Sequence, residues 1–296
     1  MQTLKAIATP TPASIGATAP RTEASPRPST RRRKLTVAAR IGLGLIFGLS
    51  GINHALGLVA MPPMSGSTAL FWEGLAQTKY FFPLLGLVEL AAGALLATGW
   101  MVPLGLALVA PVVVNMVLFH ALLAPQGLGI AALVLALAGA VARGHWAAFR
   151  RVLTARPAPA AEARPAAATR VLEIGLGLAF LASGVAGATG HTPPPSTAGA
   201  AAMMQGLAAS GYFMPLLCGV QMAGGALLVA RRYVGIALLA LAPVVVEILA
   251  YRLYVAAAKP GMVVVAVALA AAMIGLAAAH RRMFAPWAAA GAASED

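Results

Sequence analysis

A long apolar stretch that occurs twice constrains this chain more than any other feature. Residues 74–120 read GLAQTKYFFPLLGLVELAAGALLATGWMVPLGLALVAPVVVNMVLFH, and residues 206–252 follow the same pattern without a gap. Roughly 20 of about 45 aligned positions are identical at a shift of about 132 residues, far above chance. Upstream, Ile41–Gly51 aligns with Ile174–Gly184. The sequence therefore predicts a tandem duplication.

The scarcity of charge predicts that lipid is the solvent of this chain. Apolar residues make up 60% and charged residues 10% of the sequence, whereas soluble domains carry about 25% charged residues. The net charge of +13 does not indicate nucleic acid as a partner, because the positive residues do not alternate with aromatic ones. They cluster at the ends of apolar runs, as in cytoplasmic flanks of membrane helices. These clusters are Arg31–Lys34, residues 143–151, Arg231–Arg232 and Arg281–Arg282.

Eight apolar runs are long enough to cross a bilayer, which takes about 20 residues. We expect spans near 36–57, 80–98, 101–123, 128–145, 170–189, 212–230, 233–256 and 261–279. The predicted fold class is an all-α integral membrane protein with eight transmembrane helices, arranged as two parallel four-helix repeats that form a pseudo-dimer. The expected organisation is a disordered basic cytoplasmic tail (1–34), a first repeat (35–152), a cytoplasmic linker (153–168), a second, diverged repeat (169–285) and a tail (286–296).

Charge at the turns predicts the orientation. The basic N-terminal tail is expected inside, and each four-span unit returns to its starting side, so both termini are predicted to be cytoplasmic in the inner (cytoplasmic) membrane. The alternative for the first residues is a transit peptide or a twin-arginine signal at Ser29–Lys34. Residues 69–78, in the predicted outside loop after the first span, have the pattern of a short interfacial helix.

Small residues predict where helices meet, because association in lipid depends on close contact and polar pairing. Gly44, Gly48 and Gly51 share one face of the first span. Gly86 and Gly93 share a face of the second span with Glu89.

Polar residues inside spans are costly and usually face the bundle interior or a watery cavity. The first half carries Arg40, Asn53, His54, Glu89, Asn115 and His120, and the second half carries Arg170, Glu173, Gln221, Glu247 and Arg252. In the alignment Glu173 lies opposite Arg40, Gln221 opposite Glu89, Glu247 opposite Asn115 and Arg252 opposite His120, while Asn53 and His54 become Ala186 and Gly187. Each of these positions differs in chemistry between the halves.

Two interpretations of this set compete. In the structural one, polar residues join helices through ion pairs: Arg40 with Glu173, Arg170 with Glu173, or Glu247 with Arg252. In the functional one, Glu89, Asn115 and His120 line a pocket reached from outside, which binds a quinone-like ligand or passes protons, with Asn53 and His54 as further candidates. Glu89 is then the expected proton carrier.

Known catalytic and metal-binding motifs are missing from the sequence. It has no His-x3-His or carboxylate–His helix motif for a metal, no nucleophile elbow, no phosphate loop and no CxxCH haem attachment. A haem between two histidines rests on residue count alone. The single cysteine, Cys218, is expected to be a buried packing residue.

Several segments resemble the DoxX-like membrane protein family. They are Arg40–His54 (RIGLGLIFGLSGINH), Gly74–Leu84 (GLAQTKYFFPL), Val88–Gly93 (VELAAG) and Ala110–His120 (APVVVNMVLFH). The resemblance covers the first four spans well and the last four more weakly. It implies a four-helix membrane unit, here doubled, and quinone-linked redox work through similarity to a subunit of a thiosulfate–quinone oxidoreductase. The motif positions Glu89, Asn115 and His120 match in the first half only.

The sequence therefore predicts a membrane subunit of a quinone-linked redox or thiol-stress system that acts with membrane or soluble redox partner subunits and carries no self-contained catalytic motif. The alternatives are a small-molecule or proton-coupled transporter, in which Glu89, Glu247 and Arg252 face a solvent path, and a non-catalytic scaffold that binds partner proteins through its outside loops.

Overall fold

The chain folds into α-helices, as a computed structural model shows for residues 30–59, 63–154, 167–255 and 260–289. Over these ranges no strand occurs. The α-helices are α1 (Thr30–Leu56), α2 (Gly66–Ala76), α3 (Phe81–Thr98), α4 (Val102–Leu122), α5 (Leu128–Gly144), α6 (Trp146–Phe149), α7 (Ala167–Ala188), α8 (Ala198–Ala209), α9 (Phe213–Val229), α10 (Val234–Tyr254), α11 (Pro260–Ala279) and α12 (Arg281–Ala289), with a short 3-10 turn at Pro125–Gly127.

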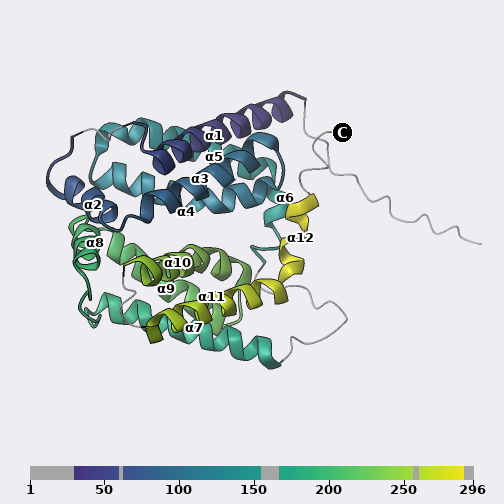
Figure 1. The fold of residues 1–296 in the computed structure, drawn as a ribbon. Coiled ribbons are helices and arrows are strands. Elements are labelled where there is room, and N and C mark those ends of the chain that lie inside the picture. The colour runs from purple at the N-terminus through teal and green to yellow at the C-terminus, as the bar shows by residue number, and fades with distance from the viewer. Residues whose placement is uncertain (1–29, 60–62, 155–166, 256–259, 290–296) are drawn as a thin grey trace, which may run out of the picture.

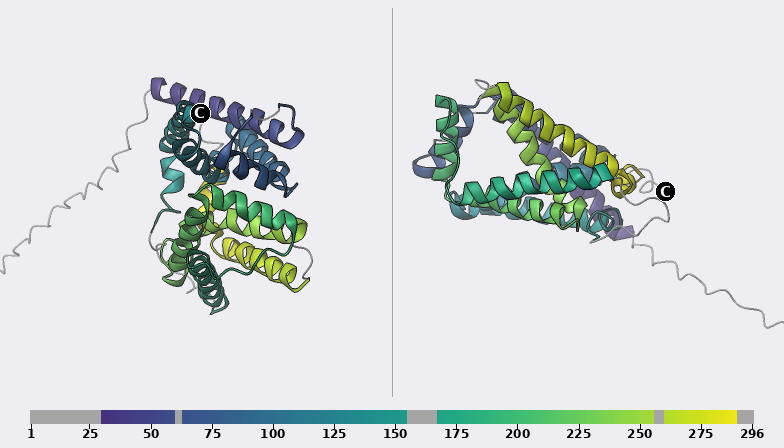
Figure 2. Two further views of the ribbon diagram at one scale, coloured as in Figure 1. Left: turned by 90° about the vertical axis from the view of Figure 1, so that its left-hand side faces the viewer. Right: turned by 90° about the horizontal axis from the view of Figure 1, so that it is seen from below.

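The long helices lie in two groups, each with its own apolar core (Figure 1). Helices α1, α3, α4 and α5 form one group, and α7, α9, α10 and α11 form the other; we call α1–α6 the first half and α7–α12 the second half. The short helices α2 and α8 lie side by side at one end of the bundle, while α6 and α12 lie at the other end (Figure 1). A view turned by 90° keeps the two groups apart (Figure 2).

Seven of the described helices are long and apolar enough to cross a membrane. The count is eight if α8 and α9, which are bent by 93° at their junction, are taken as one span. Helix α9 has 17 residues, which is at the short limit for a spanning helix. The prediction of an all-helical chain with membrane-length apolar helices is therefore confirmed, and the helices lie within a few residues of the expected ranges.

Glycines set the packing of α1 against α3, as their spacing predicts. A Cβ atom on Gly93 would lie 2.6 Å from the backbone nitrogen of Gly48, and one on Gly86 would lie 2.7 Å from the carbonyl oxygen of Gly51. Only glycine permits backbones to approach this closely. In the second half α7 and α9 meet in the same way, because a Cβ on Gly225 would lie 2.6 Å from the carbonyl oxygen of Gly177.

The ends of the chain are more helical than the sequence predicts. Helix α1 begins at Thr30, within the expected tail of residues 1–34, and α12 continues to Ala289, past the expected boundary at 286. Trp287 explains the second difference: its side chain is buried, and its Nε1–H donates to the carbonyl oxygen of Ala148, 3.1 Å away. The remainder of the predicted tails and residues 155–166 of the predicted linker lie outside the described residues.

Candidate functional site

His54 and Glu89 form a buried acid–base pair between α1 and α3. The Nδ1 atom of His54 lies 2.7 Å from an oxygen of the Glu89 carboxyl group. Glu89 is 2% exposed, whereas the His54 side chain keeps 24% of its surface. The pair therefore joins a carboxyl group inside the bundle to an imidazole that reaches the surface of the protein.

The glycine contact between the two helices places this pair. Gly51 and Gly86, which meet across α1 and α3, each precede a member of the pair by three residues, about one helical turn. Residues three apart lie on the same helix face. The close backbone approach at the glycines therefore brings the side chains of His54 and Glu89 within hydrogen-bond distance.

Aromatic rings extend the site away from Glu89. The His54 ring stacks on Phe82, with centroids 5.8 Å apart and an interplanar angle of 21°. Phe82 in turn stacks on Trp72 of α2 at 5.7 Å and 16°. Trp72 also makes an edge contact with Phe119 of α4, with centroids 5.4 Å apart. The rings of His54, Phe82 and Trp72 are thus nearly parallel, and His54 contacts the buried carboxyl group of Glu89. We call His54, Glu89, Phe82 and Trp72 the aromatic–acid site.

The second ring nitrogen of His54 is the open hydrogen-bonding position of this site. Nδ1 faces Glu89 and also lies 3.5 Å from the hydroxyl oxygen of Ser50. Nε2 has no hydrogen-bond partner among the residues that the structure describes. A ligand at the exposed edge of the ring meets an imidazole whose other nitrogen is held by a carboxyl group, which is the arrangement of a general acid or base.

The structure shows no contact among Glu89, Asn115 and His120, the residues of the predicted pocket, because each of the three has a different hydrogen-bond partner. Glu89 contacts His54, and Asn115 accepts a hydrogen bond from Tyr212 of the second half, 2.8 Å away. His120 Nδ1 lies 2.9 Å from the carbonyl oxygen of Ala124, just beyond the end of α4. The side chains of Glu89, Asn115 and His120 therefore make three separate hydrogen-bond contacts.

Asn53 also caps a helix end. Its Oδ1 atom accepts a hydrogen bond of 2.7 Å from the backbone N–H of Val59, past the C-terminus of α1. Of the five first-half candidates, the structure thus brings together only His54 and Glu89.

Two tyrosines that the sequence analysis passed over bridge the halves. The hydroxyl of Tyr80 donates to Glu247, 2.5 Å away, and the hydroxyl of Tyr212 donates to Asn115. Tyr80 and Tyr212 are 132 positions apart, and so are Asn115 and Glu247. The sequence therefore contains a pattern that could have indicated these contacts. Each half has a tyrosine at the same aligned position, and each half has a polar residue, Asn115 or Glu247, at a second aligned position that the tyrosine of the other half can reach.

Equivalent hydroxyls position these tyrosines. Thr78 donates to the carbonyl oxygen of Leu75 and accepts from the backbone N–H of Phe81, which starts α3. Ser210 makes the same two contacts, with Leu207 and Phe213, at the start of α9. Burial, with the nearby Glu247 carboxyl, raises the pKa of the Tyr80 hydroxyl far above its usual range. Tyr80 therefore stays protonated and donates at any physiological pH.

The ion pairs of the second half differ from those predicted. Glu173, 1% exposed, contacts Arg231 Nε and His280 Nε2, each at 2.8 Å. It does so because α7 places it beside the ends of α9 and α11, whereas Arg170 points outward and is exposed. These contacts replace the predicted pairs of Glu173 with Arg40 and Arg170.

The remaining predicted ion-pair residues also find other partners. Arg40 donates to the carbonyl oxygen of Leu96 at 3.0 Å. Glu247 accepts from Tyr80, so the predicted pair with Arg252 does not form; the Arg252 guanidinium lies over the Tyr251 ring, 5.5 Å from its centroid. Gln221 is buried opposite Glu89 in the alignment, and its Oε1 atom has no hydrogen-bond partner within the described residues.

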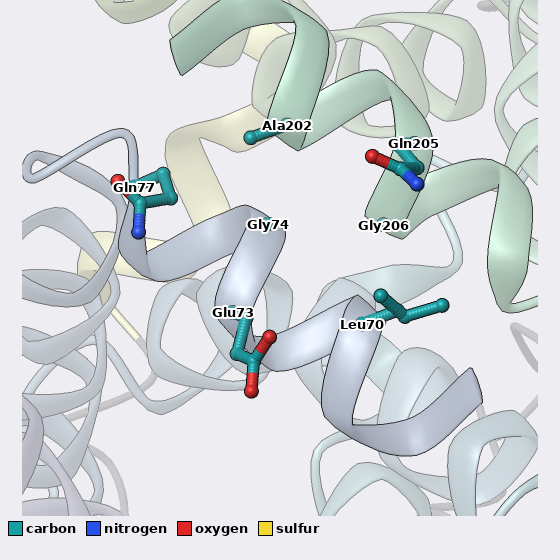
Figure 3. A pocket seen from close by; sticks show the side chains of 7 residues that line it. All are labelled: Leu70, Glu73, Gly74, Gln77, Ala202, Gln205 and Gly206. Carbon is teal, nitrogen blue, oxygen red and sulfur yellow. The ribbon is translucent and has the colours of Figure 1, made fainter. Parts of the chain in front are cut away.

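A shallow pocket of about 220 Å³ lies where α2 meets α8. Figure 3 shows it between Leu70, Glu73 and Gln77 of the first half and Ala202 and Gln205 of the second. Polar side chains line it together with apolar ones and glycines, and none of the predicted site residues reaches it. We therefore treat it as part of the contact between α2 and α8.

No group of three or more His, Cys, Asp or Glu side chains that could hold a metal ion occurs in the described ranges. Comparisons with protein-family models, with curated proteins and with solved structures gave no match. The function must therefore be argued from the site itself.

Proposed function

We propose that this chain is a polytopic membrane protein whose aromatic–acid site binds an isoprenoid quinone, and that it serves as a membrane subunit of a quinone-linked redox or thiol-stress system. The contact that carries the proposal is the 2.7 Å pair of His54 with buried Glu89 beside the stacked rings of Phe82 and Trp72. The resemblance to DoxX-like proteins in the segments that hold His54 and Glu89 implies the same class of ligand.

The residues of the site fit a quinone. The partly exposed rings of Phe82 and Trp72 offer an apolar surface beside the stack for a flat ring, and Nε2 of His54 is the free hydrogen-bonding atom toward which a carbonyl oxygen can turn. When bound, a quinone accepts two electrons and two protons to become the quinol. His54 would hold a proton at Nε2 toward the bound ring and exchange protons with the Glu89 carboxyl group through Nδ1. A redox-active partner subunit would supply the two electrons.

We further propose that the two halves form a pseudo-dimer related by a two-fold axis. The reciprocal contacts of Tyr80 with Glu247 and of Tyr212 with Asn115 support this arrangement, because in a two-fold interface residue i contacts j while the copy of j contacts the copy of i. Gly74 and Gly206, also 132 positions apart, lie against each other in the contact between the two halves, which we call the seam. The second half then acts as scaffold for the first.

The distribution of charge supports an orientation with both termini in the cytoplasm. Arginines gather at the end of the bundle that holds α6 and α12, namely Arg143, Arg150, Arg151, Arg231, Arg232, Arg281 and Arg282. The end with α2 and α8 carries Glu73 and Lys79. We propose that the arginine-rich end faces the cytoplasm and that the aromatic–acid site lies toward the outer surface of the inner membrane.

Quinone extraction tests the proposed ligand. The protein is purified in mild detergent as wild type, Glu89→Gln and Glu247→Gln, and bound quinone is extracted and identified. We expect about one quinone per chain in the wild type and in Glu247→Gln, which alters a carboxyl group outside the site, and loss of quinone in Glu89→Gln.

The same preparation separates the alternatives. Absence of quinone from all three proteins, with proton movement into proteoliposomes that needs Glu89 or Glu247, would favour a transporter. Absence of quinone with partner capture that survives both substitutions would favour a scaffold. Either result contradicts the quinone proposal.

A further inference from the structure

We propose that the second half positions the ligand site of the first: α8 clamps α2 so that Trp72 stays stacked on Phe82 beside His54. The identity of the ligand rests on the proposed function. The clamp itself rests on contacts between α2 and α8, and it makes Gly206 a positioning residue for a site that it does not touch.

The clamp begins with two glycines at the crossing of α2 and α8. A Cβ atom on Gly206 would lie 2.5 Å from the carbonyl oxygen of Leu70, and one on Gly74 would lie 2.6 Å from the carbonyl oxygen of Ala202. Both obstacles are backbone atoms, which cannot rotate away as side chains do. The two helices therefore keep their distance only while both positions are glycine.

Buried apolar side chains also pack between α2 and α8 at this crossing. Phe71 and Leu75 of α2 share one apolar cluster with Met203 and Leu207 of α8, and all four are at most 5% exposed. The Phe71 ring also lies 6.3 Å from that of Tyr212, at the start of α9. The second half thus supplies much of the surface on which α2 is buried.

Trp72 follows Phe71 directly, so any movement of α2 moves Trp72. The two rings meet edge to face, with centroids 5.5 Å apart. Trp72 then makes the stacking contact with Phe82 at the aromatic–acid site. Gly206 contacts Gly74, and helix α2 connects Gly74 to Trp72. Trp72 stacks on Phe82, and Phe82 stacks on His54.

Helix α2 needs this support. It has 11 residues, and its N-cap residue Ser65 makes no side-chain capping hydrogen bond. Isolated helices shorter than about 12–15 residues are marginal in water. Its orientation therefore depends on tertiary packing, and the glycine crossing with α8 is the closest such contact that α2 makes with the second half.

The test follows the environment of Trp72 by ¹⁹F NMR of protein labelled with fluorotryptophan. The chain contains four tryptophans, so the Trp72 resonance can be assigned by its loss in Trp72→Phe. Gly206→Ala is compared with Gly219→Ala, a matched change in α9 where an added Cβ would meet no atom within 4 Å. We expect the Trp72 resonance to shift or broaden in Gly206→Ala only, and quinone occupancy to fall several-fold with it.

A Trp72 resonance that stays in place in folded Gly206→Ala overturns the clamp, whatever binds at the site. A shifted resonance in a protein that never holds quinone supports the clamp and contradicts only the proposed ligand. If Gly206→Ala does not fold, Leu207→Ala removes a buried contact of the same crossing without adding an atom. An unchanged Trp72 resonance in that variant would also overturn the clamp.

Discussion

The aromatic–acid site lies at one corner of the first half, and the aligned corner of the second half carries different chemistry. The corner of the first half holds His54, Glu89, Phe82 and Trp72. The aligned residues of the second half are Gly187, Gln221, Met214 and Met204. An acid–base pair with stacked rings thus corresponds to a neutral amide among flexible apolar side chains, and Cys218 lies where Gly187 leaves room.

What the corners share is equally informative. Gly51 meets Gly86 in the first half, and the aligned Gly184 meets the backbone of Cys218 in the second. The turns before α3 and α9 also keep the same hydroxyl hydrogen bonds. Helix packing is therefore common to both halves, whereas the titratable pair is confined to one. The difference supports placing the proposed ligand site in the first half.

Removal of His54 should have the largest effect on stability. His54→Ala leaves the buried Glu89 carboxyl group without its partner, which costs about 3–5 kcal/mol when one member of a buried pair is lost. Gln221→Leu, at the position of the second half that aligns with Glu89, removes a buried oxygen that lacks a partner and should be neutral or slightly stabilising. Unfolding in mixed micelles measures both, and equal losses would contradict the functional difference between the corners.

The glycine crossings should instead respond alike in both halves. Gly93→Ala and Gly225→Ala each place a methyl group against the backbone of a facing helix, and overpacking of this kind costs about 1–3 kcal/mol. Gly42→Ala and Gly175→Ala, at aligned positions where a Cβ would meet no atom within 4 Å, are the controls. They should leave the unfolding free energy unchanged or raise it by up to about 1 kcal/mol, because alanine favours a helix more than glycine does. A crossing that tolerates alanine in only one half would show that the packing is not shared.

The two tyrosines of the seam should differ modestly. Tyr80→Phe removes the donor to the Glu247 carboxyl group and leaves that group without this partner, at a cost of about 1–3 kcal/mol. Tyr212→Phe removes the donor to the neutral Asn115 amide, at about 0.5–1.5 kcal/mol. The same micelle unfolding experiment ranks them. A larger loss for Tyr212→Phe would reverse the expected order.

Alkaline pH should loosen the seam through Tyr80. Because burial raises the pKa of its hydroxyl, the folded protein keeps a proton that the unfolded chain releases near pH 10. This stabilisation is full below about pH 10 and declines as pH rises beyond it. The unfolding free energy of the wild type should therefore fall more steeply above pH 10 than that of Tyr80→Phe. Parallel pH profiles would show that the Tyr80 hydroxyl is not responsible.

Hydropathy and small-residue spacing suffice to predict most of the fold. The apolar runs correspond to α1, α3, α4, α5, α7, α9, α10 and α11, and the glycines of α1 and α3 meet as their spacing predicts. Both are local patterns, set by a bilayer about 30 Å thick and by helical periodicity. Two helix ends differ from the prediction. Helix α1 starts earlier, at Thr30, and α12 extends further because Trp287 makes a tertiary contact with Ala148.

The site was harder to predict, because its contacts cross the sequence. Glu89 and His54 were both candidates, but 35 positions separate them, and only the crossing of α1 and α3 brings them together. Asn115 and His120 were grouped with Glu89 as polar residues of the first-half spans, although nothing in helical periodicity brings them into contact. Tyr80 is the first residue of the expected span 80–98, and a search for charged, histidine and amide side chains passes over a tyrosine hydroxyl.

Photolabelling with an azido-quinone tests the central claim most directly, because it reports which of the two corners holds the ligand. Purified protein is labelled with and without excess unlabelled quinone, and the modified peptides are identified by mass spectrometry. Our account predicts label that excess quinone abolishes in α2, α3 or the C-terminal part of α1, and not in α8 or α9. Competed label in the second half, or equal label in both halves, would contradict the assignment of the site to the first half.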